Sequence, residues 1–302
     1  MSNAGEHSVG WLFQSVLRLL ATVLVGLLLA GTLIRCAPGF GVDGRELDAR
    51  LNAGSVHRLR AAAGQGRNLW DFYAGYAKGI ARGDLGTSLA LGQPVSRLLR
   101  ERAPVTVATA GAGLVAAWIC ALALALASVL SRNRAPGLAG GALSSALLCL
   151  PASAIGLLTI LVSTRTGHSA MVAVAIALVV FPRLFRLSHG ILAGAMASPH
   201  VCCALARGVS RARLVIWHIL APSAAPLLAL AGISTTLAFG AAIPVEVVCD
   251  SPGIGQLAWQ AALQRDFPLL VNLSLIVCVL TAGSNVLAEA AAGRIGTEKP
   301  GR

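Results

Sequence analysis

The chain contains six apolar runs, most of them longer than 20 residues, and this pattern constrains its fold more than any other feature. A helix needs about 20 apolar residues to cross a hydrocarbon core of ~30 Å, whereas a soluble chain shows apolar stretches of roughly 4–12 residues. Hydrophobic residues make up 56% of the chain and charged residues only 12%. We therefore predict an all-α, polytopic membrane protein with six transmembrane helices, at residues 11–34, 104–130, 138–162, 170–185, 227–249 and 269–292.

The basic charge of the chain lies between these runs. The formal net charge is +12, arginine supplies nearly all of the positive charge, and aromatic residues make up only 5% of the chain. In a soluble protein such a charge would suggest nucleic-acid binding. Basic loops beside apolar spans are instead what membrane topology requires, so we exclude nucleic acid as a partner and expect lipid contact.

Loop charge also predicts the orientation, because short loops rich in Lys and Arg face the cytoplasm. The arginine-rich loops follow the second and fourth spans and hold Arg132, Arg134, Arg183, Arg186, Arg207, Arg211 and Arg213. The loop after the third span has only Arg165, and the loop after the fifth balances Arg265 with Asp250 and Asp266. These two loops are predicted to lie outside, which places both termini in the cytoplasm.

Three regions follow from this topology. Residues 1–34 form an N-terminal tail and a retained first span, since the segment before Trp11 lacks the basic cluster of a signal peptide. Residues 35–103 are predicted to form an external helical cap, with amphipathic segments at 45–63 and 69–80. Residues 104–302 form a five-helix core, which includes a cytoplasmic loop at about 198–226 between the fourth and fifth spans.

This cytoplasmic loop has an internal pattern. Ala204 and Gly208 lie four residues apart and would share a helix face on which another protein could approach the backbone closely. Ser210 is placed to cap a following helix at 211–220, and prolines then set the angle at which the chain returns to the bilayer. The alternative is an amphipathic helix that only anchors on anionic lipid.

Two further motifs lie at the predicted outer side. In the segment from Glu246 to Pro268, a proline and two glycines reverse the chain so that a short helix from about Gln256 folds back, and Asp266 is placed to cap the sixth span. Glu246 ends an apolar run, where an acid is costly unless it is paired or hydrated. We favour a structural arginine partner for it over direct contact with substrate. The other motif, GDLGTS at residues 83–88, is a turn signal.

In order and interval, these motifs resemble those of ABC importer permeases of the dipeptide/oligopeptide/nickel family. The loop of that family has a glycine, a histidine ten residues later and a proline eight further on, and Gly208, His218 and Pro226 match all three. The outer motifs of the family, P-G-L-G and G-D-L-G-x-S, are also matched, except that Ile254 takes the place of the leucine in the first. The chain departs from the family pattern at Pro199–His200, where Asp-Tyr is usual, and at its C-terminus.

The resemblance implies the permease subunit of an ATP-driven importer in the bacterial inner membrane, which carries peptides or a similar small solute, or nickel. It also implies partners: a second permease subunit in a heterodimer, two cytoplasmic ATPase subunits, and a periplasmic or lipid-anchored binding protein. The implied ATPase-docking residues are Ala204, Ala206, Arg207, Gly208, Val209, Ser210, Arg211, His218 and Pro226. The implied pore-mouth or gate residues are Glu246, Pro252, Gly253, Gly255 and Asp266, and the implied periplasmic turn is Gly83, Asp84, Leu85, Gly86 and Ser88.

Patterns of catalysis are missing from the sequence. It has no G-x-x-x-x-G-K-[ST] phosphate loop, so ATP hydrolysis is expected on separate chains. None of the seven cysteines forms a C-x-x-C pair, and we expect no metal site, no cofactor and no catalytic residue. Two other interpretations stay open: a secondary transporter or channel that acts without ATPases, and a degenerate permease paralogue with a structural or regulatory role.

Overall fold

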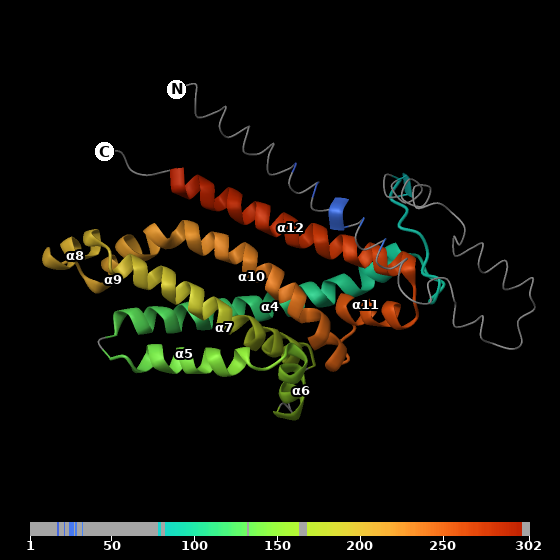
Figure 1. Ribbon diagram of the computed structural model, residues 1–302, viewed down its shortest axis with the longest axis horizontal. Coiled ribbons are helices and arrows are strands. Elements are labelled where there is room, and N and C mark those ends of the chain that lie inside the picture. The colour runs from blue at the N-terminus through green and yellow to red at the C-terminus, as the bar shows by residue number, and fades with distance from the viewer. Residues whose placement is uncertain are drawn as a thin grey trace, which may run out of the picture. The chain divides into compact units, whose positions relative to one another are not determined.

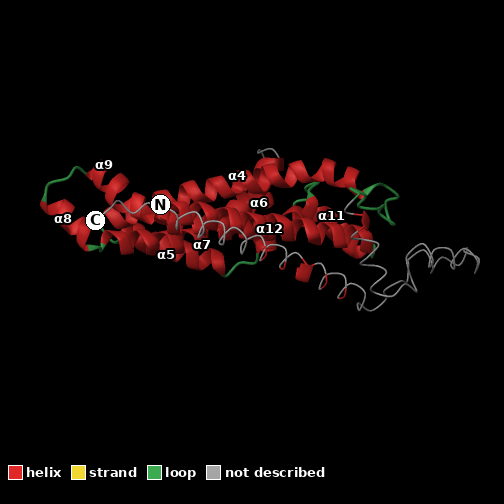
Figure 2. Ribbon diagram, turned by 90° about the horizontal axis from the view of Figure 1, so that it is seen from above, coloured by secondary structure: helices red, strands yellow, loops and turns green. Residues whose placement is uncertain are grey.

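The computed structural model describes residues 82–131, 133–162 and 168–297, together with residues 17, 21, 24–26, 28, 32, 78 and 79. Within these ranges every regular element is a helix, apart from an isolated bridge between Thr87 and Pro94 (Figure 2). The all-α prediction is thus confirmed for the described part of the chain. The predicted first span and most of the predicted external cap, including both amphipathic segments up to residue 77, lie outside the described residues.

The colours of the helices in Figure 1 follow chain order, ending in red at α12. They are α4 (Val95–Leu130), α5 (Ala135–Leu148), α6 (Ala152–Val162), α7 (His168–Met196), α8 (Pro199–Ala206), α9 (Arg211–Arg213), the π-helix η2 (Leu214–Leu220), α10 (Ala221–Val248), α11 (Ile254–Leu263) and α12 (Phe267–Thr297). In the described part of the chain, four helical stretches are long and apolar enough to cross a membrane, at Val95–Leu130, His168–Met196, Arg211–Val248 and Pro268–Gly293. A bent pair, α5 with α6, makes a fifth candidate if it is counted as one span.

The predicted third span is divided. Residues 138–162 were expected to form one helix, but α5 and α6 meet at an angle of 106°. The cause is Pro151, which has no backbone N–H and disfavours helical geometry at the residue before it. The last turn of α5 tightens, with Leu150 N donating to Leu147 O at 3.2 Å, and a new helix starts where Ile155 N donates to Pro151 O at 3.1 Å.

The predicted fourth span is longer than expected. It was predicted to end at residue 185, with Pro182 and Arg183 as its stop, but α7 continues through both to Met196. Arg183 and Arg186 therefore belong to a helix and not to a cytoplasmic loop. A proline in a membrane helix is tolerated when neighbouring helices cover it, and Pro182 is buried. Buried residues recur at helical spacing on both sides of the proline, at Val180, Phe181, Leu184, Phe185, Ser188 and Leu192.

The chain divides into two compact units. Unit 2 comprises Thr106–Ser251 and Leu280–Arg302, and in it α7 lies between α5 and α10 (Figure 1). Small residues allow the helices to approach closely. A Cβ atom added to Gly140 of α5 would lie 2.3 Å from Cζ of Phe185, and one added to Gly113 of α4 would lie 2.6 Å from the carbonyl oxygen of Ala173. Such contacts are typical of helix packing in membranes, where van der Waals fit replaces the hydrophobic effect.

Unit 1 comprises Met1–Val105 and Pro252–Val279, and it has a smaller core of its own. The apolar face of α11 packs against the first turns of α4 and the first half of α12. The buried residues of this core are Val95, Leu98, Leu99, Ile254, Leu257, Ala261, Leu269 and Leu273. Arg102 of α4 adds a polar contact, since its Nη1 donates to Oε1 of Gln256 at 3.2 Å. The chain reversal predicted after residue 252 is thus anchored on two helices.

Candidate functional site

Residues 198–226, which we name the coupling segment, form a helix–turn–helix in unit 2. The short helix α8 packs on η2, and both lie where α7 ends and α10 begins (Figure 1). The contact buries Val201 and Ala204 on one side and Leu214 and Ile219 on the other. The segment is therefore packed onto the body of unit 2. Because η2 runs into α10 as one long helix, Arg211–Val248, the segment is also continuous with a candidate span.

Gly208 ends the first helix of the segment. Its φ is +70°, a left-handed conformation that favours glycine. Val209 N donates to Ala204 O at 3.2 Å and Gly208 N donates to Leu205 O at 3.0 Å, which is the hydrogen-bond pattern of a Schellman cap. The predicted helix face shared by Ala204 and Gly208 is therefore not formed, because α8 stops at Ala206.

The other predicted docking residues differ in exposure. Ala204 is buried, at 4% exposure, so its small size serves internal packing against the core of unit 2. Ala206, Arg207, Gly208, Ser210 and Arg211 are exposed, Val209 and His218 are partly buried, and Pro226 is exposed within α10. Ser210 occupies the N-cap position of α9, but its side chain makes no capping hydrogen bond. The exposed part of the segment is therefore a turn with a basic surface.

A histidine pair holds the two helices of the segment together. Nε2 of His200 lies 3.0 Å from the carbonyl oxygen of His218, which can only accept, so this ring nitrogen donates. The cause of this bond is local. In an α-helix the carbonyl of His218 would accept a hydrogen bond from the N–H of residue 222, but Pro222 has no N–H. The predicted helix at 211–220 is present, but most of it is the π-helix η2. The Pro199–His200 departure from the family pattern thus has a structural role.

The motif GDLGTS opens a compact loop in unit 1, residues 82–94, which we name the outer loop. Gly83 and Gly86 both have a φ of +76°. Oδ1 of Asp84 accepts a hydrogen bond from Gly86 N at 2.9 Å, and Ser88 N donates to Gln93 O at 2.9 Å. The predicted turn is present.

Asp266 joins the outer loop to α12. Its carboxylate is buried, at 1% exposure, and accepts hydrogen bonds from the hydroxyl of Ser88 and, at 3.1 Å, from Ala90 N. Its other oxygen accepts from Leu269 N at 3.2 Å, so the predicted cap of the last helix is present. Asn272 adds a second link by donating to Leu85 O at 2.9 Å. Two motifs that lie 178 residues apart in the sequence therefore form one structure.

The predicted pore-mouth residues fall in both units. Pro252 is exposed, Gly253 occupies the N-cap position of α11, and Gly255 is buried in its first turn. The helix begins at Ile254, two residues before the predicted start. These residues and Asp266 belong to unit 1, whereas Glu246, which is fully buried in α10, belongs to unit 2. The predicted gate residues are therefore divided between the two units.

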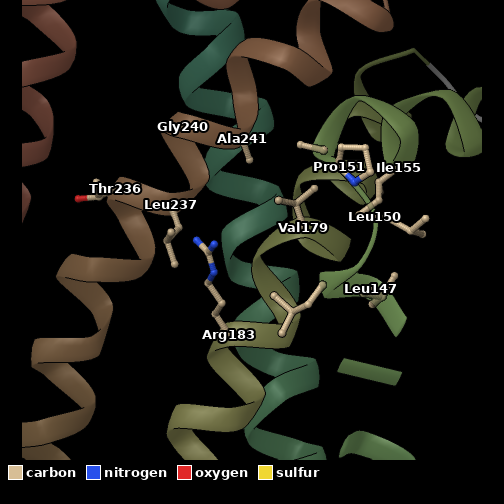
Figure 3. Close-up of a pocket in the computed structure, with 12 residues that line it drawn as sticks. Leu147, Leu150, Pro151, Ile155, Val179, Arg183, Thr236, Leu237, Gly240 and Ala241 are labelled. Carbon is tan, nitrogen blue, oxygen red and sulfur yellow. The ribbon is translucent and has the colours of Figure 1, made fainter. Parts of the chain in front are cut away.

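A cavity of about 380 Å³ lies within unit 2 (Figure 3). Its walls are the break between α5 and α6, one face of α7, and the middle of α10. The lining residues are Leu147, Leu148, Leu150, Pro151, Ala152, Ile155, Val179, Arg183, Thr236, Leu237, Gly240 and Ala241. Most of the lining residues are apolar, Thr236 is polar, and Arg183 is the one charged side chain in that set.

Comparison with known proteins identifies the family. Residues 106–297 match the family described as the binding-protein-dependent transport system inner membrane component. The chain belongs to this family. As a member of it, the protein is a multi-pass permease component of the ABC type, a class that works with ATPase and binding-protein partners, and its function is transport.

Several curated permeases are similar to this chain over most of its length. Glutathione transport system permease protein GsiC of Salmonella typhi is 24% identical, over 92% of this chain and 98% of the relative. The protein of the same name from Escherichia coli O6:H1 is 23% identical over the same shares. A putative peptide permease protein of Brucella ovis is 26% identical, over 88% of this chain and 93% of the relative.

Three residues of this permease were missed as functional or structural candidates in the sequence. Arg183 was counted as loop charge, and His200 only as a departure from the family pattern. Asn272 lies in an apolar run, where a polar residue is a usable signal because it needs a hydrogen-bond partner. The bend after α5 also had a signal, the proline at 151 in the middle of a predicted span.

Proposed function

We propose that this permease is one of two non-identical permease subunits in an ATP-driven importer for peptides or a similar small solute. Nickel is the alternative cargo from the family resemblance. The permease would cross the inner membrane six times with both termini in the cytoplasm, and residues 35–103 would form a periplasmic cap. The names of the similar curated proteins, which are glutathione and peptide permeases, support a peptide-like cargo.

The observation that carries this proposal is the geometry of the coupling segment. Its exposed turn presents the side chains of Arg207, Arg211 and Arg213 beside a tightly capped helix end. Guanidinium groups bind carboxylates in a fixed geometry, so the turn suits docking to an acidic groove on an ATPase subunit. Residues 204–211 with His218 and Pro226 are the proposed docking region, in which Ala204 and His218 act from inside by holding the turn in place.

Force from the ATPases would pass through η2. Because Arg211–Val248 is one continuous helix, a displacement of the turn is carried along the axis of α10. The packing of α8 on η2 means that the two helices move together. Alternating access then follows if ATP binding and hydrolysis favour different positions of this helix. On the outer side, α11, the outer loop and Asp266 would receive solute from the binding protein, with Glu246 as a further gate residue.

A charge-reversal experiment tests the docking proposal. The variant with Arg207→Glu and Arg211→Glu is co-expressed with the ATPase subunits of the importer, and co-purification from detergent is measured. Both side chains are exposed, so the fold should survive while the association is lost. The matched control is Arg134→Glu, which changes an exposed arginine of another predicted cytoplasmic loop. Equal recovery of ATPase with both variants would refute docking at this turn.

Gly208→Arg is a weaker test of docking, because any side chain at a φ of +70° strains the turn itself.

The interpretation as a transporter without ATPases has its own test. Solute uptake by proteoliposomes that contain the permease subunits alone would support that interpretation and contradict the proposed function.

A further inference from the structure

The cavity of unit 2 is lined by a cation, Arg183, which belongs to the candidate span α7. Arg183 lies 15 residues after His168, the first residue of α7, which is roughly 22 Å along the helix axis. The helix, His168–Met196, contains a stretch that is long and apolar enough to cross a membrane. Ionisable residues inside membrane helices are costly, and they commonly line a hydrated path or contact a transported group.

Arg183 differs from its neighbour on the same helix. Nη2 of Arg186 donates to Oγ of Ser145 on α5 at 2.8 Å. The side chain of Arg183 instead extends into the space between α7 and α10, beside Leu237 (Figure 3). Among the described residues no hydrogen bond or ion pair is formed by its guanidinium group, whose five donors are therefore available to an anion that enters the cavity.

The broken span adds a second source of positive potential. Pro151 and Ala152, at the start of α6, line the same cavity as Arg183. The first N–H groups of a helix have no intrahelical partner, and the helix dipole favours an anion at that end. In transporters, such ends of discontinuous helices face anionic groups of the substrate. The helix α6 has 11 residues and is long enough for this effect.

The remaining walls suit the apolar part of a small solute. Leu147, Ile155, Val179 and Leu237 are aliphatic, and Gly240 leaves the backbone of α10 accessible. The volume of about 380 Å³ is within the range of small-molecule sites. An apolar chamber with positive potential at one wall selects a carboxylate attached to a small organic group. It disfavours a bare metal cation.

We propose that this cavity contacts the solute during translocation and that Arg183 binds its carboxylate. The inference rests on the proposed function, and within it favours a peptide-like acid over nickel as cargo. It assigns a solute-selecting role to this permease in addition to any selection by the binding protein.

The test compares two probes in proteoliposomes that contain the complete importer: trialanine, and trialanine amide, which lacks the carboxylate. In Arg183→Gln, uptake of trialanine should fall about tenfold, because a charge-assisted hydrogen bond is lost, while uptake of the amide should change by less than about twofold. Arg183→Lys keeps the charge and should retain part of the uptake. The matched control is Arg186→Gln, one turn away and outside the cavity, which should treat the two probes alike.

Two outcomes would overturn the proposal. If uptake of the two probes falls equally in Arg183→Gln, Arg183 has a general role in transport and does not bind the carboxylate. If the two permease subunits no longer associate in that variant, Arg183 binds an acidic side chain of the second permease subunit. A further measurement separates this inference from the proposed function: trialanine binding to the purified full-length permease, by calorimetry without ATPases. Weaker binding by Arg183→Gln than by wild type supports the site even if no ATPase associates, whereas equal or absent binding by both overturns it.

Discussion

The contact between Ser88 and Asp266 should dominate the stability of the outer loop. The carboxylate of Asp266 is almost fully buried and accepts three hydrogen bonds, from the hydroxyl of Ser88, from Ala90 N and from Leu269 N. We predict that Ser88→Ala and Asp266→Ala both destabilise unit 1, and that their effects are strongly non-additive.

The magnitudes follow from the bonds that each change removes. Ser88→Ala removes two hydrogen bonds, one to the charged Asp266 carboxylate and one that Oγ accepts from Leu91 N at 3.0 Å, which together are worth about 2 kcal/mol. Asp266→Ala removes all three bonds, including a helix cap worth about 1 kcal/mol, and leaves buried donors without an acceptor, for a total of about 4 kcal/mol. Asp266→Ala leaves the Leu91 bond in place, so the double variant should cost about 0.5 kcal/mol more than Asp266→Ala alone, and the interaction energy between the two sites is about 1.5 kcal/mol.

Hydrogen exchange measured by mass spectrometry reports this loop directly. A loss of about 2 kcal/mol should speed the exchange of backbone amides at residues 86–95 about 30-fold in Ser88→Ala. The matched control is Thr87→Ala, whose side chain is exposed and whose removal should change stability by less than about 0.5 kcal/mol. The reasoning fails if the two single changes add to within about 0.5 kcal/mol, or if the control speeds exchange as much as Ser88→Ala.

Three other changes test the packing of unit 2. Gly140→Ala should destabilise the protein by about 1–3 kcal/mol in mixed-micelle unfolding, because its Cβ meets the Phe185 ring, and adding Phe185→Leu should recover most of the loss. Gly208→Ala should cost about 1 kcal/mol through its positive φ and reduce ATPase co-purification less than the charge-reversal variant does. Trp118→Phe removes a 3.0 Å bond from Nε1 to Ser234 Oγ and should cost about 0.6 kcal/mol in the same unfolding assay, so a cost above about 2 kcal/mol would contradict it.

The sequence predicted the helices better than their interruptions. Apolar runs near 20 residues identify membrane helices reliably, since the backbone must be satisfied within the segment. Proline was misjudged in both directions. Pro182 was taken as a stop, yet neighbouring helices cover it and the helix continues, whereas Pro151 was passed over and breaks its span. The outcome at each proline depends on what packs against it, which local pattern does not show.

The site could be predicted where its cause is local. Asp266 as a helix cap depends on residues within one turn and was predicted. The helix end at Gly208 is just as local, with partners within five residues, but the sequence pattern predicted a helix face for Gly208 instead. The link from Ser88 to Asp266 and the shared lining of the cavity by Pro151 and Arg183 join distant segments. Local sequence patterns do not show such contacts between distant segments, so these contacts were found only in the structure.

The bend between α5 and α6 has a consequence for biogenesis. The two helices have 14 and 11 residues, about 21 and 16 Å long, so neither alone reaches across a hydrocarbon layer of ~30 Å. At the bend itself, the N–H groups of Cys149 and Leu150 donate to carbonyls of α5, and the carbonyl of Pro151 accepts from the first turn of α6. We therefore expect the two helices to insert as a pair, and the packing of α7 and α10 against them to fix the angle of the bend.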